Sequence, residues 1–177
     1  MGGLKALRPF RGEPLVVNAL AQARRWSDDV VVSVRDAAQL AGAVEAPLIL
    51  DRADVPGPLA GLAAALQHAR SVGAQFVLTI PCDMPRLPVD LAETLAAALT
   101  ADDGVALPEV EGFLQPVCGL WRPRVLGGLT DYLAAGRRSL KGFAETCGLT
   151  AVAFADAAAF AGANTPEELA ALERKDP

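Results

Sequence analysis

The fold is decided by residues 47–80, PLILDRADVPGPLAGLAAALQHARSVGAQFVLTI. The two largely apolar ends of this stretch, Pro47–Leu50 and Gln75–Ile80, have the composition of strands buried on both faces. Between them, Leu59–Arg70 is rich in alanine and leucine, which favour a helix. A strand, a helix and a second strand in this order form a βαβ unit with parallel strands. The stretch therefore predicts an α/β protein.

The same alternation continues on both sides of this stretch. Pro14–Arg25 predicts an earlier helix, and the β-branched run Asp29–Val34 predicts a strand. We expect one domain over residues 1–177, built as a three-layer, doubly wound, mostly parallel sheet of Rossmann-like type. Further strands are expected at Gly104–Pro108, Gln115–Trp121 and Leu149–Phe154, and further helices at Pro88–Leu99, Val125–Ala134, Leu140–Thr146 and from Asn164 onward.

Composition excludes several classes of function. The chain has 177 residues and a net charge of −5, which argues against a general nucleic-acid-binding surface. Its apolar runs are shorter than the roughly 18–20 residues that span a bilayer, and its start lacks the apolar core of a signal peptide. We therefore expect a cytoplasmic protein that binds neither membranes nor nucleic acid. The basic clusters Lys5–Arg11 and Arg137–Lys141 fit either a solvated face or an anion site.

Histidine and cysteine usage narrows the chemistry further. His68 is the single histidine, so a Ser-His-Asp triad or a histidine-rich metal site is hard to build. Cys82, Cys118 and Cys147 are far apart and odd in number, which indicates neither a disulfide framework nor zinc. Any reaction must depend on carboxylates, lysine, arginine and the backbone.

Asp83 is the first candidate site residue. It lies in Thr79–Pro85, TIPCDMP, where the strand predicted at Gln75–Ile80 ends. Ligands of open α/β sheets bind outside the carboxyl ends of the strands. Mg²⁺ prefers one or two carboxylates together with phosphate oxygens, so an aspartate held here between two prolines could bind Mg²⁺ beside a triphosphate. A turn or helix-capping aspartate is the equally weighted alternative.

The second candidate is the segment Asp51–Gly61, DRADVPGPLAG, between a predicted strand and a helix. Pro-Gly-Pro fixes a tight turn, and Gly57 and Gly61 allow close approach of a ligand to the backbone. The amides that follow open a helix N-terminus. A loop of this kind suits recognition of a flat base, although a purely structural turn is favoured on position alone.

The third candidate is Met1–Lys5, MGGLK. Glycine backbone and a lysine can bind phosphate, but the fragment matches no P-loop pattern. By itself, it is most simply interpreted as a flexible start.

Taken together and in order, these motifs resemble the MobA family of molybdenum cofactor guanylyltransferases. The resemblance covers nearly the whole chain, and Pro-Gly-Pro-Leu-Ala-Gly combined with Pro-Cys-Asp-x-Pro is fairly specific for the family. The motifs are Met-Gly-Gly-x-Lys at 1–5, Pro-Gly-Pro-Leu-Ala-Gly at 56–61, Pro-Cys-Asp-Met-Pro at 81–85, Gln-Pro at 115–116 and Asn-Thr-Pro-Glu-Glu-Leu at 164–169.

The resemblance implies an enzyme that transfers GMP from GTP to the molybdenum-bound pterin cofactor, with Mg²⁺ as its metal. It implies that Lys5 and Asp83 are catalytic, Lys5 at the nucleotide phosphates and Asp83 as the Mg²⁺ ligand. Nucleotide binding, in the N-terminal half, would use Gly2, Gly3, Lys5, Asp54, Pro56, Gly57, Pro58, Leu59, Ala60 and Gly61. The pterin side, in the C-terminal half, would use Gln115, Pro116, Arg137, Arg138 and Asn164. Implied partners include other cofactor-biosynthesis proteins and apo-molybdoenzymes.

Two departures from the family pattern bear on activity. The family normally begins with a strand and Leu-Ala-Gly-Gly-x-Ser-x-Arg-Met-Gly-Gly, whereas this chain begins at the last Met-Gly-Gly. We therefore expect it to lack the usual first strand and most of the glycine-rich loop, either because its true start lies upstream or because it is a truncated relative. The second departure is Gly162, where the family often has asparagine, so one polar contact to substrate is expected to be lost.

Three alternatives stay open beside guanylyl transfer. The chain could be a cytidylyltransferase for the same pterin, or another MobA-like enzyme that acts on a sugar or alcohol phosphate. It could also be a non-catalytic homologue that binds the cofactor.

Overall fold

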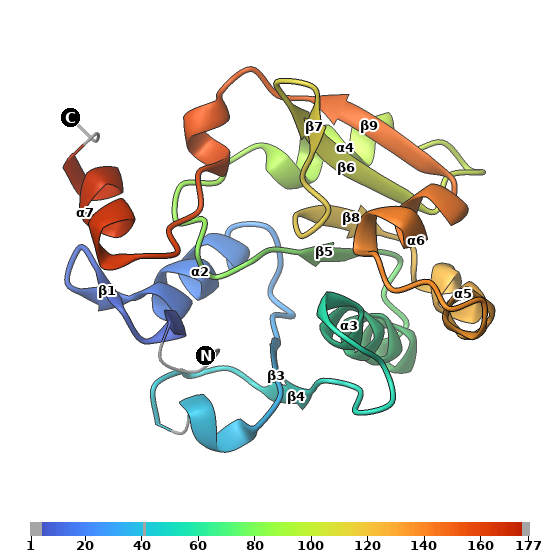
Figure 1. Cartoon of the computed structure of the whole chain (residues 1–177), viewed down its shortest axis with the longest axis horizontal. Helices are drawn as coiled ribbons and strands as arrows, with labels where there is room; N and C mark the ends of the chain where they lie inside the picture. The colour runs from blue at the N-terminus through green and yellow to red at the C-terminus, as the bar shows by residue number, and fades with distance from the viewer. Residues whose placement is uncertain (1–4, 41, 175–177) are drawn as a thin grey trace.

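The structure is a computed structural model that describes residues 5–40 and 42–174 (Figure 1). The helices are α2 (Leu15–Ala23), α3 (Pro58–Val72), α4 (Leu91–Ala98), α5 (Leu129–Ala134), α6 (Leu140–Thr146) and α7 (Pro166–Arg174), with 3₁₀ helices η1 (Ala37–Leu40), η2 (Pro123–Gly128) and η3 (Ala157–Phe160). The strands are β1 (Pro9–Phe10), β2 (Glu13–Pro14), β3 (Val32–Val34), β4 (Leu48–Leu50), β5 (Val77–Thr79), β6 (Val105–Val110), β7 (Phe113–Leu114), β8 (Gly119–Trp121) and β9 (Leu149–Ala153).

A five-stranded sheet forms the centre of the molecule, with helices on both faces. Its order is β5-β8-β6-β7, and β9 pairs with β6. On one face, Val105 and Leu107 of β6 pack with side chains of α3, α5 and α6. On the other face, Ala106 and Val110 pack with α4 and η3. Side chains of a strand alternate between its faces, so β6 joins both halves of the core. The expected three-layer α/β architecture is confirmed.

Strand direction differs from the expectation at β8. It runs antiparallel to both β5 and β6, while β9 runs parallel to β6, so the central sheet is mixed. The cause is a tight hairpin after β6, where Glu111 and Gly112 have φ of 51° and 80°. Two consecutive residues with positive φ form the two-residue turn that reverses a strand onto its neighbour. The strand predicted at Gln115–Trp121 is also shorter, because Gln115 accepts a hydrogen bond from the Cys118 amide (3.0 Å) in a turn.

A separate two-stranded parallel sheet holds β3 and β4, in the register Val32↔Leu48 and Val34↔Leu50. Within residues 5–40 and 42–174, no backbone hydrogen bond joins this sheet to β5. Helix α3 follows β4 and leads into β5, as the βαβ prediction required.

Helix boundaries follow the local chemistry. The helix predicted at Leu59–Arg70 is α3, which begins at Pro58 and ends before Gly73 in a left-handed cap. The helix predicted at Val125–Ala134 is divided into η2 and α5 at Gly127–Gly128, because glycine weakens a helix interior. None of the helices in the described part of the chain is long and apolar enough to cross a membrane.

Candidate active site

Asp83 lies on the loop that follows β5, beside a segment from the end of the chain. Its backbone carbonyl accepts a hydrogen bond from the Ala163 amide at 3.0 Å. A Cβ atom placed on Gly162 would lie 3.8 Å from Oδ2 of Asp83, which is ordinary contact distance. Gly162, where the sequence departs from the family pattern, therefore lies next to the Asp83 carboxylate. A Cβ atom would fit at this position without a clash.

Lys5 joins Asp83 to Asn164. The Lys5 ammonium forms an ion pair with Oδ2 of Asp83 and donates a hydrogen bond of 2.6 Å to Oδ1 of Asn164. The Lys5 and Asp83 side chains are 23% and 22% exposed, so solvent screens this pair only in part. Arg8 donates to the Asn164 carbonyl at 2.9 Å. Three residues predicted from separate motifs thus meet at one point.

The start of α7 holds Asn164 in place. The amides of Asn164 and Thr165 both donate to Oε2 of Glu168, at 2.6 and 3.0 Å, and the Glu168 amide donates to Oγ1 of Thr165 at 3.1 Å. This reciprocal pattern is a capping box. Because two amides donate to its carboxylate, the pKa of Glu168 lies below its ordinary value. The cap fixes the backbone from which the Asn164 side chain reaches Lys5.

Gln22 forms hydrogen bonds to the loop that contains Asp83. It was not predicted from the sequence. It is buried on α2, accepts from the Leu87 amide at 3.0 Å and donates to the Met84 carbonyl at 3.3 Å. A signal did exist, because Gln22 shares the buried helical face of Leu15 and Ala19. A polar residue on such a face usually has a specific partner.

Cys82 precedes Asp83 and is no thiolate at neutral pH. Burial raises the pKa of the Cys82 thiol, and the neighbouring Asp83 carboxylate raises it further. A nucleophilic cysteine needs the opposite shift.

The loop after β4 carries the second predicted motif. Gly57 has φ 62° and ψ −148°, a conformation open essentially to glycine alone, and Pro58 begins α3 directly after it. Asp54 is paired through both carboxylate oxygens with the guanidinium of Arg52. The hydrogen bonds from Arg52 lower the pKa of Asp54, although its side chain is 66% exposed.

Gly61 marks a close approach between α3 and the ends of β3 and β4. The Ser33 hydroxyl donates to Oδ1 of Asp51, and a Cβ atom on Gly61 would lie 3.2 Å from Oγ of Ser33 and 3.3 Å from that Asp51 oxygen. Such a distance is tighter than most Cβ contacts, so glycine suits this position. Ser33 and Asp51 were not among the predicted site residues.

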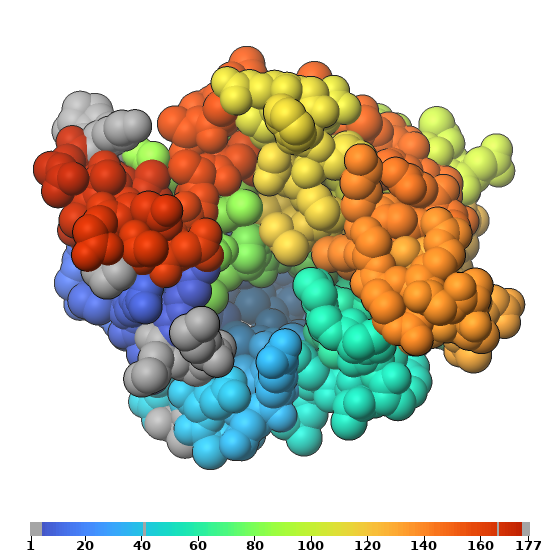
Figure 2. All heavy atoms as spheres, in the orientation of Figure 1, coloured from blue at the N-terminus to red at the C-terminus, as the bar shows by residue number. Residues whose placement is uncertain are grey.

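A cavity of about 510 Å³ lies between α3, the end of β5 and the turn before β8, and Lys5, Asp83 and Asn164 are not among the residues that line it. The first turn of α3 contributes Pro58 and Gly61, the end of β5 and the residues after it contribute Thr79 and Pro81, and the turn before β8 contributes Val117. Figure 2 shows this face hollowed at its centre, with the beginning of α3 and the turn before β8 at the rim.

Residues 1–148 match the sequence profile of the MobA-like NTP transferase domain. The chain belongs to this family. A molybdenum cofactor guanylyltransferase from Cereibacter sphaeroides is 36% identical over 99% of this chain and 92% of its own length. One from Bordetella petrii is 38% identical over 97% of this chain and 90% of its own length.

Solved structures share the fold of this MobA-like transferase. Molybdopterin-guanine dinucleotide biosynthesis protein A from Archaeoglobus fulgidus is similar with a TM-score of 0.78 and 20% identity, covering 96% of this chain and 89% of its own. The 2-C-methyl-D-erythritol 4-phosphate cytidylyltransferase from Thermus thermophilus is similar with a TM-score of 0.74 and 20% identity, covering 98% and 93%. The chain therefore has the same fold as these two proteins.

The predicted pterin-side residues of the MobA-like chain lie in two places. Gln115 and Pro116 lie in the turn before β8, next to the cavity residue Val117, and Gln115 donates to the Phe113 carbonyl at 3.3 Å. Arg137 and Arg138 lie on the exposed turn between α5 and α6, across the molecule from α7 in Figure 1.

Both arginines have structural partners on that turn. Arg137 lies over the ring of Tyr132, 4.6 Å from its centroid, and Arg138 donates to the Leu133 carbonyl at 2.7 Å. The structure does not bring them together with Lys5, Asp83 and Asn164. Two further predicted residues, Gly2 and Gly3, lie outside the described residues.

Asp83 and Asn164 supply oxygens of the kind that Mg²⁺ binds. Among the described residues, no group of three or more His, Cys, Asp and Glu side chains could hold an ion by itself. Mg²⁺ does not need one, because it commonly uses one or two carboxylates, water and substrate phosphates. The Lys5 ammonium already lies between Asp83 Oδ2 and Asn164 Oδ1, so these oxygens favour a cation.

Proposed function

We propose that this MobA-like transferase moves GMP from GTP to the molybdenum-bound pterin cofactor and releases pyrophosphate. The observation that carries the proposal is the meeting of Lys5, Asp83 and Asn164 beyond the carboxyl end of β5. Pro58 and Gly61 of the Pro56–Gly61 segment line a cavity together with Thr79 at the end of β5. Relatives with 36% and 38% identity are named molybdenum cofactor guanylyltransferase.

The reaction is an in-line displacement at phosphorus. An oxygen of the pterin's terminal phosphate forms a bond to the α-phosphorus of GTP, and the bond to the pyrophosphate oxygen breaks. Phosphoryl transfer of this kind depends mainly on positioning and charge neutralisation. A phosphate nucleophile is already ionised at neutral pH, so the site needs no general base. This agrees with a chain whose single histidine, His68, is on α3.

Lys5 and Asp83 would have different electrostatic roles in this reaction. The Lys5 ammonium would bind the phosphates and offset their negative charge. The Asp83 carboxylate and the Asn164 amide oxygen would hold Mg²⁺, which when bound neutralises charge on phosphate oxygens. Phosphate oxygens would then replace Asp83 as the main partners of Lys5.

Two groups of residues would receive the two substrates. Asp54 and the loop of Pro56, Gly57, Pro58, Leu59, Ala60 and Gly61 would select guanine, since a rigid backbone presents fixed donors and acceptors to a flat base. Gln115 and Pro116 would face the pterin, and Arg137 and Arg138 would attract its phosphate from the surface. The N-terminal half would thus bind nucleotide and the C-terminal half pterin, within one cytoplasmic domain that exchanges cofactor with biosynthetic proteins or apo-molybdoenzymes.

Calorimetry of GTP and CTP binding in the presence of Mg²⁺ tests the proposal. We expect the chain to prefer GTP, and the preference to weaken in Asp83→Ala but not in Asp131→Ala, an exposed aspartate on α5. Preference for CTP would indicate a cytidylyltransferase, whose fold this chain shares. Binding of neither nucleotide would overturn the proposal in favour of a non-catalytic homologue.

A further inference from the structure

Gln22 is a polar residue within the hydrophobic core, where it is only 5% exposed. It shares the buried face of α2 with Leu15 and Ala19. Burying an amide costs free energy unless the amide is hydrogen-bonded, and an apolar side chain would fill the same space without that cost. The contribution of Gln22 therefore lies in the groups that it binds.

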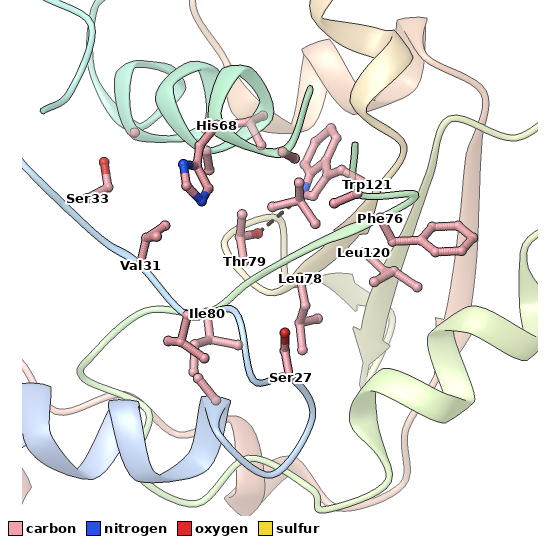
Figure 3. Close-up of a pocket in the computed structure, with 18 of the residues that line it drawn as sticks. Ser27, Val31, Ser33, His68, Phe76, Leu78, Thr79, Ile80, Leu120 and Trp121 are labelled. Carbon is pink, nitrogen blue, oxygen red and sulfur yellow. Dashed lines mark hydrogen bonds between the residues drawn. The ribbon is translucent and has the colours of Figure 1, made fainter. Parts of the chain in front are cut away.

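Both polar atoms of the Gln22 side chain bind the backbone of the loop that carries Asp83. Oε1 accepts from the Leu87 amide at 3.0 Å, and Nε2 donates to the Met84 carbonyl at 3.3 Å. One side chain thus joins the first residue after Asp83 to the fourth. Figure 3 shows Ile80 at the start of this loop, on the side of the cavity where α2 lies.

The loop, residues 80–90, has little structure of its own to fix its shape. It connects β5 to α4 and contains neither a helix nor a strand. Its prolines, at positions 81, 85 and 88, have no amide to donate. Just past the end of α2, Nε1 of Trp26 donates to the Val89 carbonyl at 2.7 Å. The chain of α2 and the turn after it therefore binds the loop at residues 84, 87 and 89.

Asp83 lies between this attachment and a second one. Its own carbonyl accepts from the Ala163 amide at 3.0 Å, and the next carbonyl, that of Met84, is bound by Gln22. The two peptide groups after the Asp83 Cα are thus fixed from opposite sides. Loss of either attachment would let the Asp83 carboxylate turn relative to the Lys5 ammonium that it binds.

Helix α2 is also attached to the segment that carries Lys5. The Leu15 amide, at the start of α2, donates to the Arg8 carbonyl at 2.9 Å, and the Arg8 amide donates to the Lys5 carbonyl at 3.1 Å. The same helix therefore places both members of the Lys5–Asp83 pair.

We propose that Gln22 is a positioning residue for the transfer reaction. It acts through the backbone of Met84 and Leu87, which sets the direction in which the Asp83 carboxylate points toward Mg²⁺ and the nucleotide phosphates. The inference rests on the proposed function, because that function makes Asp83 the Mg²⁺ ligand. Groups behind a metal ligand fix its orientation, and their loss typically lowers metal affinity by roughly 10- to 100-fold.

Calorimetry of GTP binding, with Mg²⁺ and with EDTA, separates positioning from general support of the fold. Mg²⁺ should raise the GTP affinity of the wild type, and Asp83→Ala should abolish this gain. Gln22→Met has a side chain of the same length without the two hydrogen bonds. It should reduce the gain by about tenfold and leave GTP affinity in EDTA unchanged. Gln67→Met, at an exposed position of α3, is the matched control and should keep the full gain.

Hydrogen exchange gives a second measurement that needs no ligand. The Ala163 amide binds the Asp83 carbonyl and makes no contact with Gln22 through that bond. In Gln22→Met its exchange should accelerate by about tenfold more than that of the Leu107 amide in β6, which reports unfolding of the sheet. Circular dichroism checks folding. If Gln22→Met does not fold, Gln22→Asn replaces it, since its amide is one methylene too short to reach both backbone groups.

The outcomes distinguish this inference from the proposed function. A wild type whose GTP affinity does not respond to Mg²⁺ would overturn the proposed function, and the role of Gln22 with it. A wild-type gain that Gln22→Met retains in full would overturn the role of Gln22 alone. Equal weakening of GTP binding in Mg²⁺ and in EDTA, or equal acceleration of the Ala163 and Leu107 amides, would also overturn it, because Gln22 would then support only the fold.

Discussion

The ammonium group of Lys5 lies between two oxygens, one from Asp83 and one from Asn164. Asp83→Asn keeps the size of the side chain but removes its charge. We expect kcat/KM for guanylyl transfer to fall on the order of 100-fold, because metal and phosphate binding lose their carboxylate. The unfolding free energy should change by about 1 kcal/mol or less, as is usual for partly exposed ion pairs. Steady-state assays with Asp131→Asn as control check this, and an activity within a few-fold of the wild type contradicts it.

The buried side chain of Gln22 contributes two hydrogen bonds to the loop of Asp83. Gln22→Leu removes the acceptor of the Leu87 amide and the donor to the Met84 carbonyl. Leaving these groups unpaired in the core should destabilise the protein by roughly 1–3 kcal/mol. Urea denaturation measures the change, with Gln67→Leu on the exposed face of α3 as the matched control. Equal stability of the two variants would show that the loop of Asp83 does not need this support.

Single residues were predictable where a motif named them and less so where only packing defines them. Lys5, Asp83 and Asn164 were each predicted from short patterns, and the structure brings all three together. The role of Gln22 depends on which loop lies over which helix. No spacing in the sequence encodes that arrangement.

At the scale of elements, the turn before α3 depends on glycine. Gly57→Ala puts a Cβ atom on a backbone with φ 62° and ψ −148°. We expect a loss of roughly 1–3 kcal/mol in stability from this strain, and weaker nucleotide binding because the turn must shift. Gly127→Ala is the control, since a Cβ atom there meets nothing within 4 Å. Thermal unfolding and calorimetry measure both effects, and equal behaviour of the two variants would contradict the expectation.

The capping box of α7 should make this helix sensitive to acid. The folded pKa of Glu168 is lowered, so its stabilising contribution is present above its unfolded pKa, about 4.3, and is lost as pH falls through the folded pKa. The difference in melting temperature between the wild type and Glu168→Gln should therefore be largest at neutral pH and shrink below about pH 4. A difference that does not change with pH would exclude this account.

The sequence predicted which segments are helices and which are strands. It predicted only in part whether neighbouring strands run parallel or antiparallel. Apolar runs and alanine-rich segments indicated most strands and helices because burial and propensity are local properties. The reversal of β8 arises from positive φ at Glu111 and Gly112, and glutamate is an unusual residue for such a turn. The sequence therefore had only a weak signal for the hairpin.

Ligand binding should increase the stability of the whole molecule against unfolding, because the site contains segments from the two ends of the chain. A ligand at 100 times its Kd raises the unfolding free energy by about 2.7 kcal/mol. GTP with Mg²⁺ should therefore raise the melting temperature of the wild type. Asn164→Ala should reduce that shift, because it removes the Oδ1 that accepts from Lys5. An unchanged shift in this variant would place the nucleotide elsewhere.

The hydrogen bond from Lys5 to Asn164 spans 159 positions of the chain. During translation at roughly 5–20 residues per second, the lysine waits on the order of 10 to 30 seconds for its partner to be made. Asp83 is synthesised about midway, so lysine and aspartate can meet before the asparagine exists. A ribosome that stops between Asp83 and Asn164 leaves a polypeptide with two of the three groups and without α7. Premature termination therefore yields a chain with an incomplete site, and full-length synthesis is a condition for assembling it.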